Sequence, residues 1–324
     1  MDFDKHACET YEKNLGLKPI CGKIEDYCGS GILEHFNIKK GDVDILVGCP
    51  PCQGFSNLRR TRHKEMIDDR RDLVKIFSDR VKEISPKVVI FENVPGIANL
   101  WGLPYFTNYL KKLSSLGYRN SWDYFDAANY GVPQHRKRVI CLSVKGASNQ
   151  PDLPPPTHSN PKKNDDLAPW KTVRDTIASL PVINAGECDP RIANHVARGH
   201  SEKVMNLIQK IPKNGGSRTS LPEDMWLSCH KKLEGAWSIY GRLSWDKPSG
   251  TMTCRCTSPS TGRFLHPEQD RAITAREAAL LQSFPINYHF PEAIGIAEKQ
   301  IGNAVPSEFF TVFAETAIEC LKEV

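Results

Sequence analysis

The chain has 324 residues, of which 40% are hydrophobic and 25% charged, and its net charge is +5. This length allows about two domains, and this composition is that of a globular protein rather than a disordered one. Eleven cysteines without a framework spacing argue against a secreted disulfide scaffold and favour the cytoplasm, and no apolar run approaches the length of a membrane span. The mildly basic charge is compatible with a nucleic acid partner without being diagnostic of one.

The first residues predict a helix that begins after Asp4, a good N-cap for residues 5–14. Asp2 and Phe3 precede this cap. An acid at such a place in a doubly wound fold takes a ribose hydroxyl, but the residues alone favour a solvated acid. Gly29-Ser30-Gly31 lacks a third glycine and a preceding strand, so we expect a turn rather than a phosphate loop.

The apolar run 43–47 predicts a buried strand, and a stiff turn follows it because Pro50 and Pro51 cannot continue a sheet ladder. Cys52 lies on this turn, where open α/β sheets bind their ligands, so it is placed like a nucleophile. Three alternatives remain open. Cys49 and Cys52 are spaced as a redox pair or as half of a zinc site, and Cys52 is otherwise an inert buried cysteine.

A basic stretch follows the candidate nucleophile. Residues 55–82 carry nine lysines and arginines against five acids, a difference of 9 − 5 = +4, and Arg59 and Arg60 stand near its start. Such a run is usually a solvated face, but here it is also suited to holding a phosphate backbone over the site. Residues 73–84 then predict an amphipathic helix.

A second buried strand is predicted at 87–91, and Glu92 follows it directly before a turn. Two neighbouring strands that end in a cysteine and a glutamate indicate an active site, although a surface turn would explain the glutamate equally simply. A helix over 110–116 and a strand over 121–127 come next.

The segment 131–142 is predicted to be a turn that enters a strand, in which Gln134, Arg136 and Arg138 share one face. Two arginines on an otherwise apolar strand must meet acids or an anionic ligand. An ion pair with Glu92 would itself bring both arginines to the site.

The rest of the chain has less regular patterning. Residues 150–170 are rich in proline and indicate a linker, and residues 180–265 lack strand–helix alternation. Thr274 is predicted to cap a helix that runs to about residue 283, and a last helix ends at Cys320. Candidate DNA-base readers in the irregular region rest on residue type alone: Arg218, His230, Lys231, Arg242 and Arg255.

Five short motifs in one order resemble the DNA (cytosine-5) methyltransferases over nearly the whole chain. They are Pro50-Pro51-Cys52-Gln53, Glu92-Asn93-Val94, Gln134-x-Arg136-x-Arg138, Arg276-Glu277 and Gly302-Asn303-Ala304-Val305. The resemblance implies a doubly wound α/β sheet of the S-adenosylmethionine-dependent, Rossmann-like type with a smaller, irregular target recognition domain. The catalytic domain would comprise residues 1–180 and 288–324, and the recognition domain residues 181–287.

The resemblance also implies roles for single residues. Cys52 would add to carbon 6 of a cytosine flipped out of duplex DNA, Glu92 would act on ring N3, Arg138 would contact O2, and Arg136 would support the pocket. The residues that would bind S-adenosylmethionine are Asp2, Phe3, Ile24, Pro50, Asn303 and Ala304. The basic loop resembles the segment that closes over the DNA, so Gln53, Ser56, Arg59 and Arg60 would contact DNA, and Arg242 joins them on residue type alone. No metal is implied.

The family begins with a strand and a glycine-rich cofactor loop before the position of Asp2, and Met1 stands in their place here. The sequence therefore predicts either an N-terminally truncated form or an incomplete gene call, or a chain whose missing piece another polypeptide supplies. Otherwise a monomer with a cognate restriction endonuclease is expected. Two rival functions stay open: an RNA (tRNA) cytosine-5 methyltransferase, and a catalytically silent DNA-binding or accessory subunit. The target sequence cannot be read from these residues.

Overall fold

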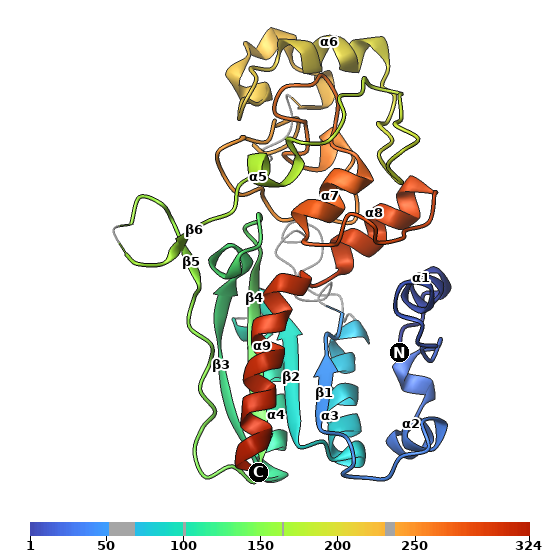
Figure 1. Cartoon of the computed structure of the whole chain (residues 1–324), viewed down its shortest axis with the longest axis vertical. Coiled ribbons are helices and arrows are strands. Elements are labelled where there is room, and N and C mark those ends of the chain that lie inside the picture. The colour runs from blue at the N-terminus through green and yellow to red at the C-terminus, as the bar shows by residue number, and fades with distance from the viewer. Residues whose placement is uncertain (52–68, 100–101, 164, 231–236) are drawn as a thin grey trace.

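The computed structural model describes residues 1–51, 69–99, 102–163, 165–230 and 237–324. The chain forms a lower part built around a β-sheet and an upper part of short helices and irregular segments (Figure 1). In the described residues no helix is both long and apolar enough to cross a membrane.

The lower part is organised by a four-stranded mixed sheet. Its strands lie in the order β1 (Ile45–Gly48), β2 (Val88–Asn93), β4 (Lys137–Lys145) and β3 (Tyr118–Asp126). β1 and β2 are parallel, whereas β4 is antiparallel to both β2 and β3. The short connection from β3 to β4 requires that antiparallel pairing, since a parallel pair needs a longer crossover. The Rossmann-like α/β fold is confirmed, with a mixed sheet.

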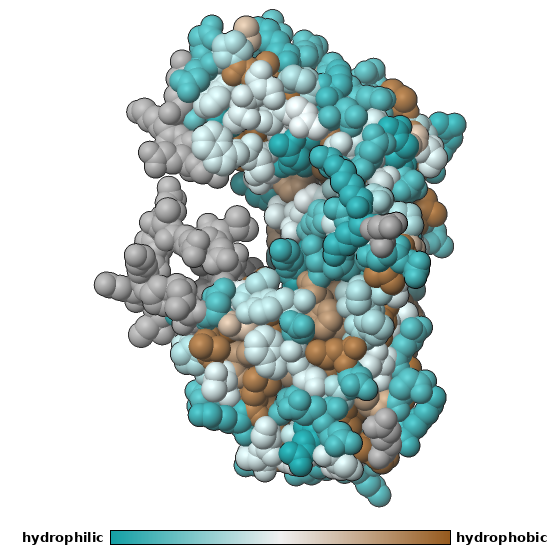
Figure 2. Space-filling view, turned by 90° about the vertical axis from the view of Figure 1, so that its left-hand side faces the viewer, coloured by the Kyte–Doolittle hydropathy of each residue, from teal (hydrophilic) through white to brown (hydrophobic). Residues whose placement is uncertain are grey.

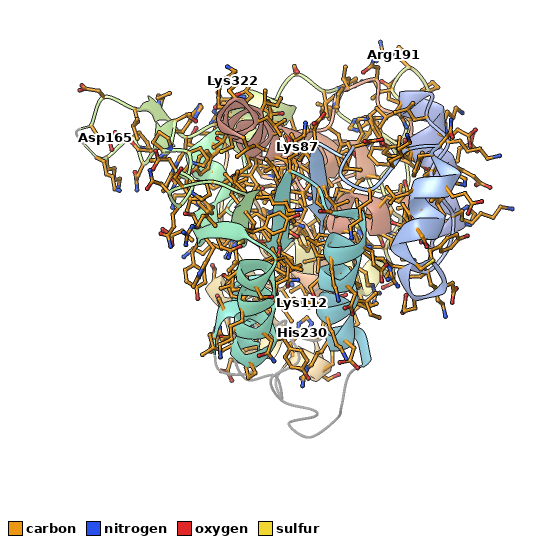
Figure 3. The ribbon with its side chains drawn as sticks, turned by 90° about the horizontal axis from the view of Figure 1, so that it is seen from below. Lys87, Lys112, Asp165, Arg191, His230 and Lys322 are labelled. Carbon is orange, nitrogen blue, oxygen red and sulfur yellow. The ribbon has the colours of Figure 1, made fainter. Side chains whose placement is uncertain are left out.

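Helices cover both faces of the sheet. α3 (Leu73–Ile84) and α4 (Leu103–Ser115) lie side by side on one face, and α9 (Ser307–Cys320) lies on the other (Figure 3). The predicted bounds of α3 are confirmed. α4 begins seven residues before its predicted start at 110, because Pro104 is tolerated in the first turn of a helix.

The N-terminal segment lies beside the sheet rather than within it (Figure 1). It contains α1 (Lys5–Leu15) and α2 (Gly29–His35), and Asp4 caps α1 as predicted. The prediction of a turn at Gly29-Ser30-Gly31 is wrong. These residues open α2, because the Cys28 sulfur accepts a hydrogen bond from the Gly31 N–H and the Glu83 carboxylate accepts one from the Gly29 N–H.

The upper part has its own apolar core. It contains α5 (Val173–Ile177), α6 (Glu202–Lys210), α7 (Ala275–Leu281) and α8 (Ile294–Asn303). Two-residue strands β5 (His158–Ser159) and β6 (Ala168–Pro169) pair below it. The core packs α5 and α8 against α7, and it therefore draws on both sides of the predicted domain boundaries at 180/181 and 287/288. Those boundaries stay a prediction.

Candidate active site

The candidate site lies where β1 and β2 end. Because the two strands are parallel and Gly48 stands opposite Phe91, their carboxyl ends lie at the same edge of the sheet. The Asn93 side-chain amide donates a hydrogen bond of 3.1 Å to the Pro50 carbonyl, which fixes the proline turn beside the end of β2. The chain is thus held at this edge two residues before Cys52.

Glu92 and Arg138 form an ion pair at this edge. The Arg138 Nε lies 2.6 Å from the Glu92 Oε1, and the two residues are only 8% and 7% exposed. Glu92 stands opposite Ile140 in the antiparallel ladder, so Arg138 is its diagonal neighbour on the same face. Of the two partners expected for these arginines, an acid or an anionic ligand, the structure shows the acid for Arg138. Glu92 itself lies inside β2, since pairing with β4 extends the strand to Asn93.

Arg136 has a positioning role in this structure. Its guanidinium donates hydrogen bonds of 3.2 Å to the Met252 and Gly302 carbonyls. Gly302 lies in the last turn of α8, where carbonyls have no partner within the helix and a cation is favourable. Arg136 therefore joins the start of β4 to the C-terminal end of α8.

Two buried glutamines extend this connection, and sequence reasoning did not assign them to the site. The Gln134 amide donates to the Leu281 carbonyl and to the Gln282 side chain, and its oxygen accepts from the Met252 N–H at 2.8 Å. Gln282 donates to the carbonyls of Ile301 and Ala304. Gln134 stood in a motif, but nothing in the local sequence distinguishes Gln282.

The end of α8 packs tightly on the segment that follows Met252. A Cβ atom added at Gly302 would lie 2.3 Å from the Cys254 nitrogen and 2.3 Å from the Thr253 carbonyl carbon. The Cys254 thiol donates to the Asn303 side-chain oxygen at 3.1 Å. Asn303 and Ala304, both predicted to contact the cofactor, are thereby held near Arg136.

The other predicted cofactor residues lie in the N-terminal segment. Asp2 pairs with Cys21 in a short parallel bridge, and its carboxylate is exposed and accepts the Asp4 N–H at 2.8 Å. The Phe3 ring is 65% exposed, and Ile24 is half-buried. An exposed acid beside an exposed aromatic ring suits the ribose and adenine of a nucleoside, so the residues present fit the expected group.

The prediction that Arg242 contacts DNA is corrected, because its side chain is buried inside the upper part. It is 0% exposed, and its guanidinium donates to the carbonyls of Ile208, Ile211, His266 and Gln269 and to the Asp270 carboxylate. Arg218 and His230 are buried as well, whereas Arg255 is exposed. Residue type alone cannot distinguish an arginine that anchors loops from one that reads bases.

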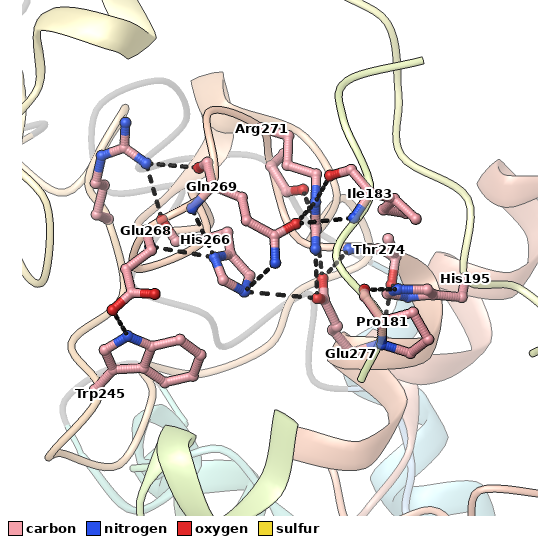
Figure 4. A network of polar contacts seen from close by, with 12 residues as sticks. Pro181, Ile183, His195, Trp245, His266, Glu268, Gln269, Arg271, Thr274 and Glu277 are labelled. Carbon is pink, nitrogen blue, oxygen red and sulfur yellow. Dashed lines mark hydrogen bonds and ion pairs between the residues drawn. The ribbon is translucent and has the colours of Figure 1, made fainter. Parts of the chain in front are cut away.

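The Arg276-Glu277 motif is also structural. Glu277 accepts two hydrogen bonds from Arg271 at 2.7 and 2.8 Å and completes a capping box with Thr274 at the start of α7 (Figure 4). Arg276 donates to the Ala193 and Tyr288 carbonyls. The motif therefore anchors irregular segments to α7.

Several predicted site residues lie outside the described residues: Cys52, Gln53, Ser56, Arg59, Arg60 and Lys231. The surface is hollowed between the upper and lower parts in the space-filling view (Figure 2). Among the described residues no group of histidines, cysteines and acids could hold a metal ion.

Solved structures with this fold are methyltransferases. A putative DNA modification methyltransferase of an *E. coli* prophage superposes with a TM-score of 0.72 at 22% identity, over 99% of this chain and 91% of that one. The Dnmt2 methyltransferase of *S. pombe* superposes with a TM-score of 0.62 at 14% identity, over 98% and 89%. The fold is therefore the mixed α/β methyltransferase fold.

The sequence comparisons define the family. The model of the C-5 cytosine-specific DNA methylases matches residues 1–319. The chain is 38% identical to the type II methylase M.HgiDII of *Herpetosiphon aurantiacus*, over 98% of this chain and 87% of the relative. It is 31% identical to the type II methyltransferase M1.HphI of *Haemophilus parahaemolyticus*, over 98% and 80%. The chain belongs to the C-5 cytosine-specific DNA methylase family, whose members use S-adenosylmethionine.

Proposed function

We propose that this chain methylates carbon 5 of a cytosine flipped out of a specific duplex DNA sequence, through a covalent bond between Cys52 and carbon 6. The observation that carries the proposal is the buried pair of Glu92 and Arg138, next to the proline turn that leads to Cys52. In its protonated form the Glu92 carboxyl can donate to N3, and the Arg138 guanidinium can donate to O2, and these two acceptors lie on one edge of the base.

Each residue has a defined task in this reaction. The Cys52 thiolate forms a bond to carbon 6, which makes carbon 5 a nucleophile, while Glu92 donates a hydrogen bond or a proton to N3 and Arg138 binds O2. After methyl transfer a base takes the carbon-5 proton as the bond between carbon 6 and sulfur breaks, which regenerates the Cys52 thiolate, and a proton donated to N3 returns to Glu92. S-Adenosylmethionine supplies the methyl group from its sulfonium.

We propose that Asp2, Phe3, Ile24 and Pro50 bind the cofactor from one side and Asn303 and Ala304 from the other. The exposed Asp2 carboxylate and Phe3 ring support the first group. Gln53, Ser56, Arg59 and Arg60 remain proposed DNA contacts.

A complementing strand is part of this proposal. Among the described residues β1 pairs with β2 alone, and Val47 in the middle of β1 is 45% exposed. An unpaired strand edge favours the addition of another strand. We propose that a polypeptide bearing such a strand and a glycine-rich loop pairs here, and that its addition raises the melting temperature and the affinity for S-adenosylmethionine. Equal values with and without it would contradict this.

The substrate is proposed to be DNA rather than tRNA, since the family model that matches residues 1–319 is that of the C-5 cytosine-specific DNA methylases and two relatives that cover 98% of this chain are named type II methylases or methyltransferases. The type II names of these relatives also favour a cytoplasmic protein that works with a cognate restriction endonuclease.

The proposal is tested by expressing the chain in a host that lacks cytosine methylation and that carries a plasmid as the DNA substrate. Bisulfite sequencing should reveal one methylated motif, which the Cys52→Ala variant loses. Methylation of tRNA alone would establish the RNA alternative. DNA binding without methylation, even with the complementing strand, would establish the silent accessory subunit.

A further inference from the structure

The two groups of proposed cofactor residues come from distant parts of the chain. Asp2 and Phe3 stand at its start, whereas Asn303 and Ala304 stand at the end of α8. In the described residues Asp2 pairs only with the Cys21 segment and is not part of the four-stranded sheet. The sheet therefore does not set the distance between the two groups, and other contacts must do so.

One such contact is an ion pair between α1 and α8. The Lys299 Nζ donates to the Asp4 Oδ2 at 2.6 Å, and this hydrogen bond lowers the pKa of Asp4 and raises that of Lys299. The Asp4 N–H in turn holds the Asp2 carboxylate at 2.8 Å. Lys299 and Asn303 are one turn apart on α8, so they share a face of the helix. Asp4 and Lys299 thus connect Asp2 to Asn303.

The second contact is a reciprocal pair of hydrogen bonds. The Asn14 side-chain amide donates to the His289 carbonyl at 2.9 Å, and the Asn14 oxygen accepts the His289 N–H at 2.8 Å. Asn14 lies near the end of α1, and His289 lies in the segment that leads into α8. α1 is therefore tied to the α8 region at both of its ends.

We propose that these contacts form a latch, made of Asp4, Lys299, Asn14 and the His289 backbone, that positions Asp2 against Asn303 at the spacing the cofactor requires. The latch rests on the proposed use of S-adenosylmethionine by these residues. Its residues are positioning residues, because none of them needs to touch the reacting atoms. The latch lowers the free energy needed to bring the two sides of the site together. Its loss should therefore weaken cofactor binding and leave the rate of the chemical step unchanged.

The test measures S-adenosylmethionine binding by calorimetry and methyl transfer kinetics for the full chain, four single variants and one double variant. Lys299→Met and Asp4→Asn break the ion pair, and asparagine at position 4 still caps α1. Asn14→Ala breaks the reciprocal bonds. Lys87→Met is the matched control, because it breaks an exposed ion pair with Asp44 of 2.7 Å on the sheet side.

We expect the cofactor Kd and KM to rise about 2- to 5-fold for Lys299→Met and Asp4→Asn, since exposed ion pairs are weak. For Asn14→Ala we expect about 10-fold, since two hydrogen bonds are lost. The kcat at saturating cofactor should not change in any variant. The Lys299→Met/Asp4→Asn double variant should be no weaker than either single one, and Lys87→Met should behave as the parent.

Hydrogen exchange at the amides of α1 separates the outcomes. Faster exchange in Asn14→Ala with an unchanged Kd would show a purely structural contact and overturn the latch. A fall in kcat at saturation would also overturn it, because the effect would lie in the chemical step. If the parent chain binds no S-adenosylmethionine even with the complementing strand, the proposed cofactor site fails first and the latch with it. If the parent chain binds S-adenosylmethionine and every variant keeps the same Kd, the latch is refuted and the proposed cofactor site is not.

Discussion

Two glycines of α8 provide a sharp test of the packing at the site. Helix propensity alone predicts that Gly295→Ala and Gly302→Ala both stabilise the protein, by about 0.5–1 kcal/mol each. A Cβ at Gly295 would meet nothing within 4 Å, so Gly295→Ala should stabilise the protein as helix propensity predicts. A Cβ at Gly302 would lie 2.3 to 2.6 Å from backbone atoms of Thr253 and Cys254, which cannot rotate away as a flexible side chain would.

We therefore expect opposite signs for the two substitutions. Relieving the overlap at Gly302 requires α8 to move away from the backbone of Thr253 and Cys254, which costs about 1–3 kcal/mol by analogy with overpacked cores. The carbonyl that Arg136 binds would move with it. Thermal unfolding should show Gly302→Ala melting about 2–8 °C below the parent and Gly295→Ala at or above it. If both variants melt above the parent, the close approach of α8 to this segment is wrong.

The remaining predictions concern the chemistry and one buried histidine. Cys52→Ser should abolish methyl transfer but keep DNA binding, and duplex DNA that contains 5-fluorocytosine should trap a covalent adduct with the parent only; equal trapping by the variant would remove Cys52 from the mechanism. Glu92→Gln should slow the single-turnover rate by about 100-fold or more, because it loses the acid, and an unchanged rate would contradict its role. Burial lowers the pKa of His266 to about 4, from an ordinary value of 6.5. The unfolded chain therefore binds the extra proton first, so stability should fall by up to about 3 kcal/mol as the pH drops from 6.5 to 4, and His266→Gln should flatten this part of the denaturation profile.

Sequence periodicity located the sheet and the helices that cover it because these elements are amphipathic or uniformly apolar. Residues 73–84 match α3, and the ends of β1 and β2 bring the Pro50 turn and Glu92 to one edge as expected. The pairing of Glu92 with Arg138 could also be expected from the sequence, because an acid is one of the partners that a buried arginine on a strand face can take.

The contacts that side chains make between distant segments could not be predicted from the sequence. Gln282 binds two carbonyls of the α8 region, and Arg242 binds four carbonyls in the irregular part, but neither contact has a period or a motif. These partners are distant in sequence or lie in segments without regular structure. Only the three-dimensional arrangement distinguishes such residues from solvent-exposed ones.

The inward-facing arginines of the upper part have a consequence for how this family can diversify. Arg242, Arg271 and Arg276 are fully buried and bind main-chain carbonyls, so they fix the path of the loops without depending on the identity of the residues they hold. Exposed positions between these anchors can then change while the loop path stays the same. Under the proposed function, a new target sequence would then evolve by substitutions at the surface of an unchanged scaffold, at exposed positions such as Arg255.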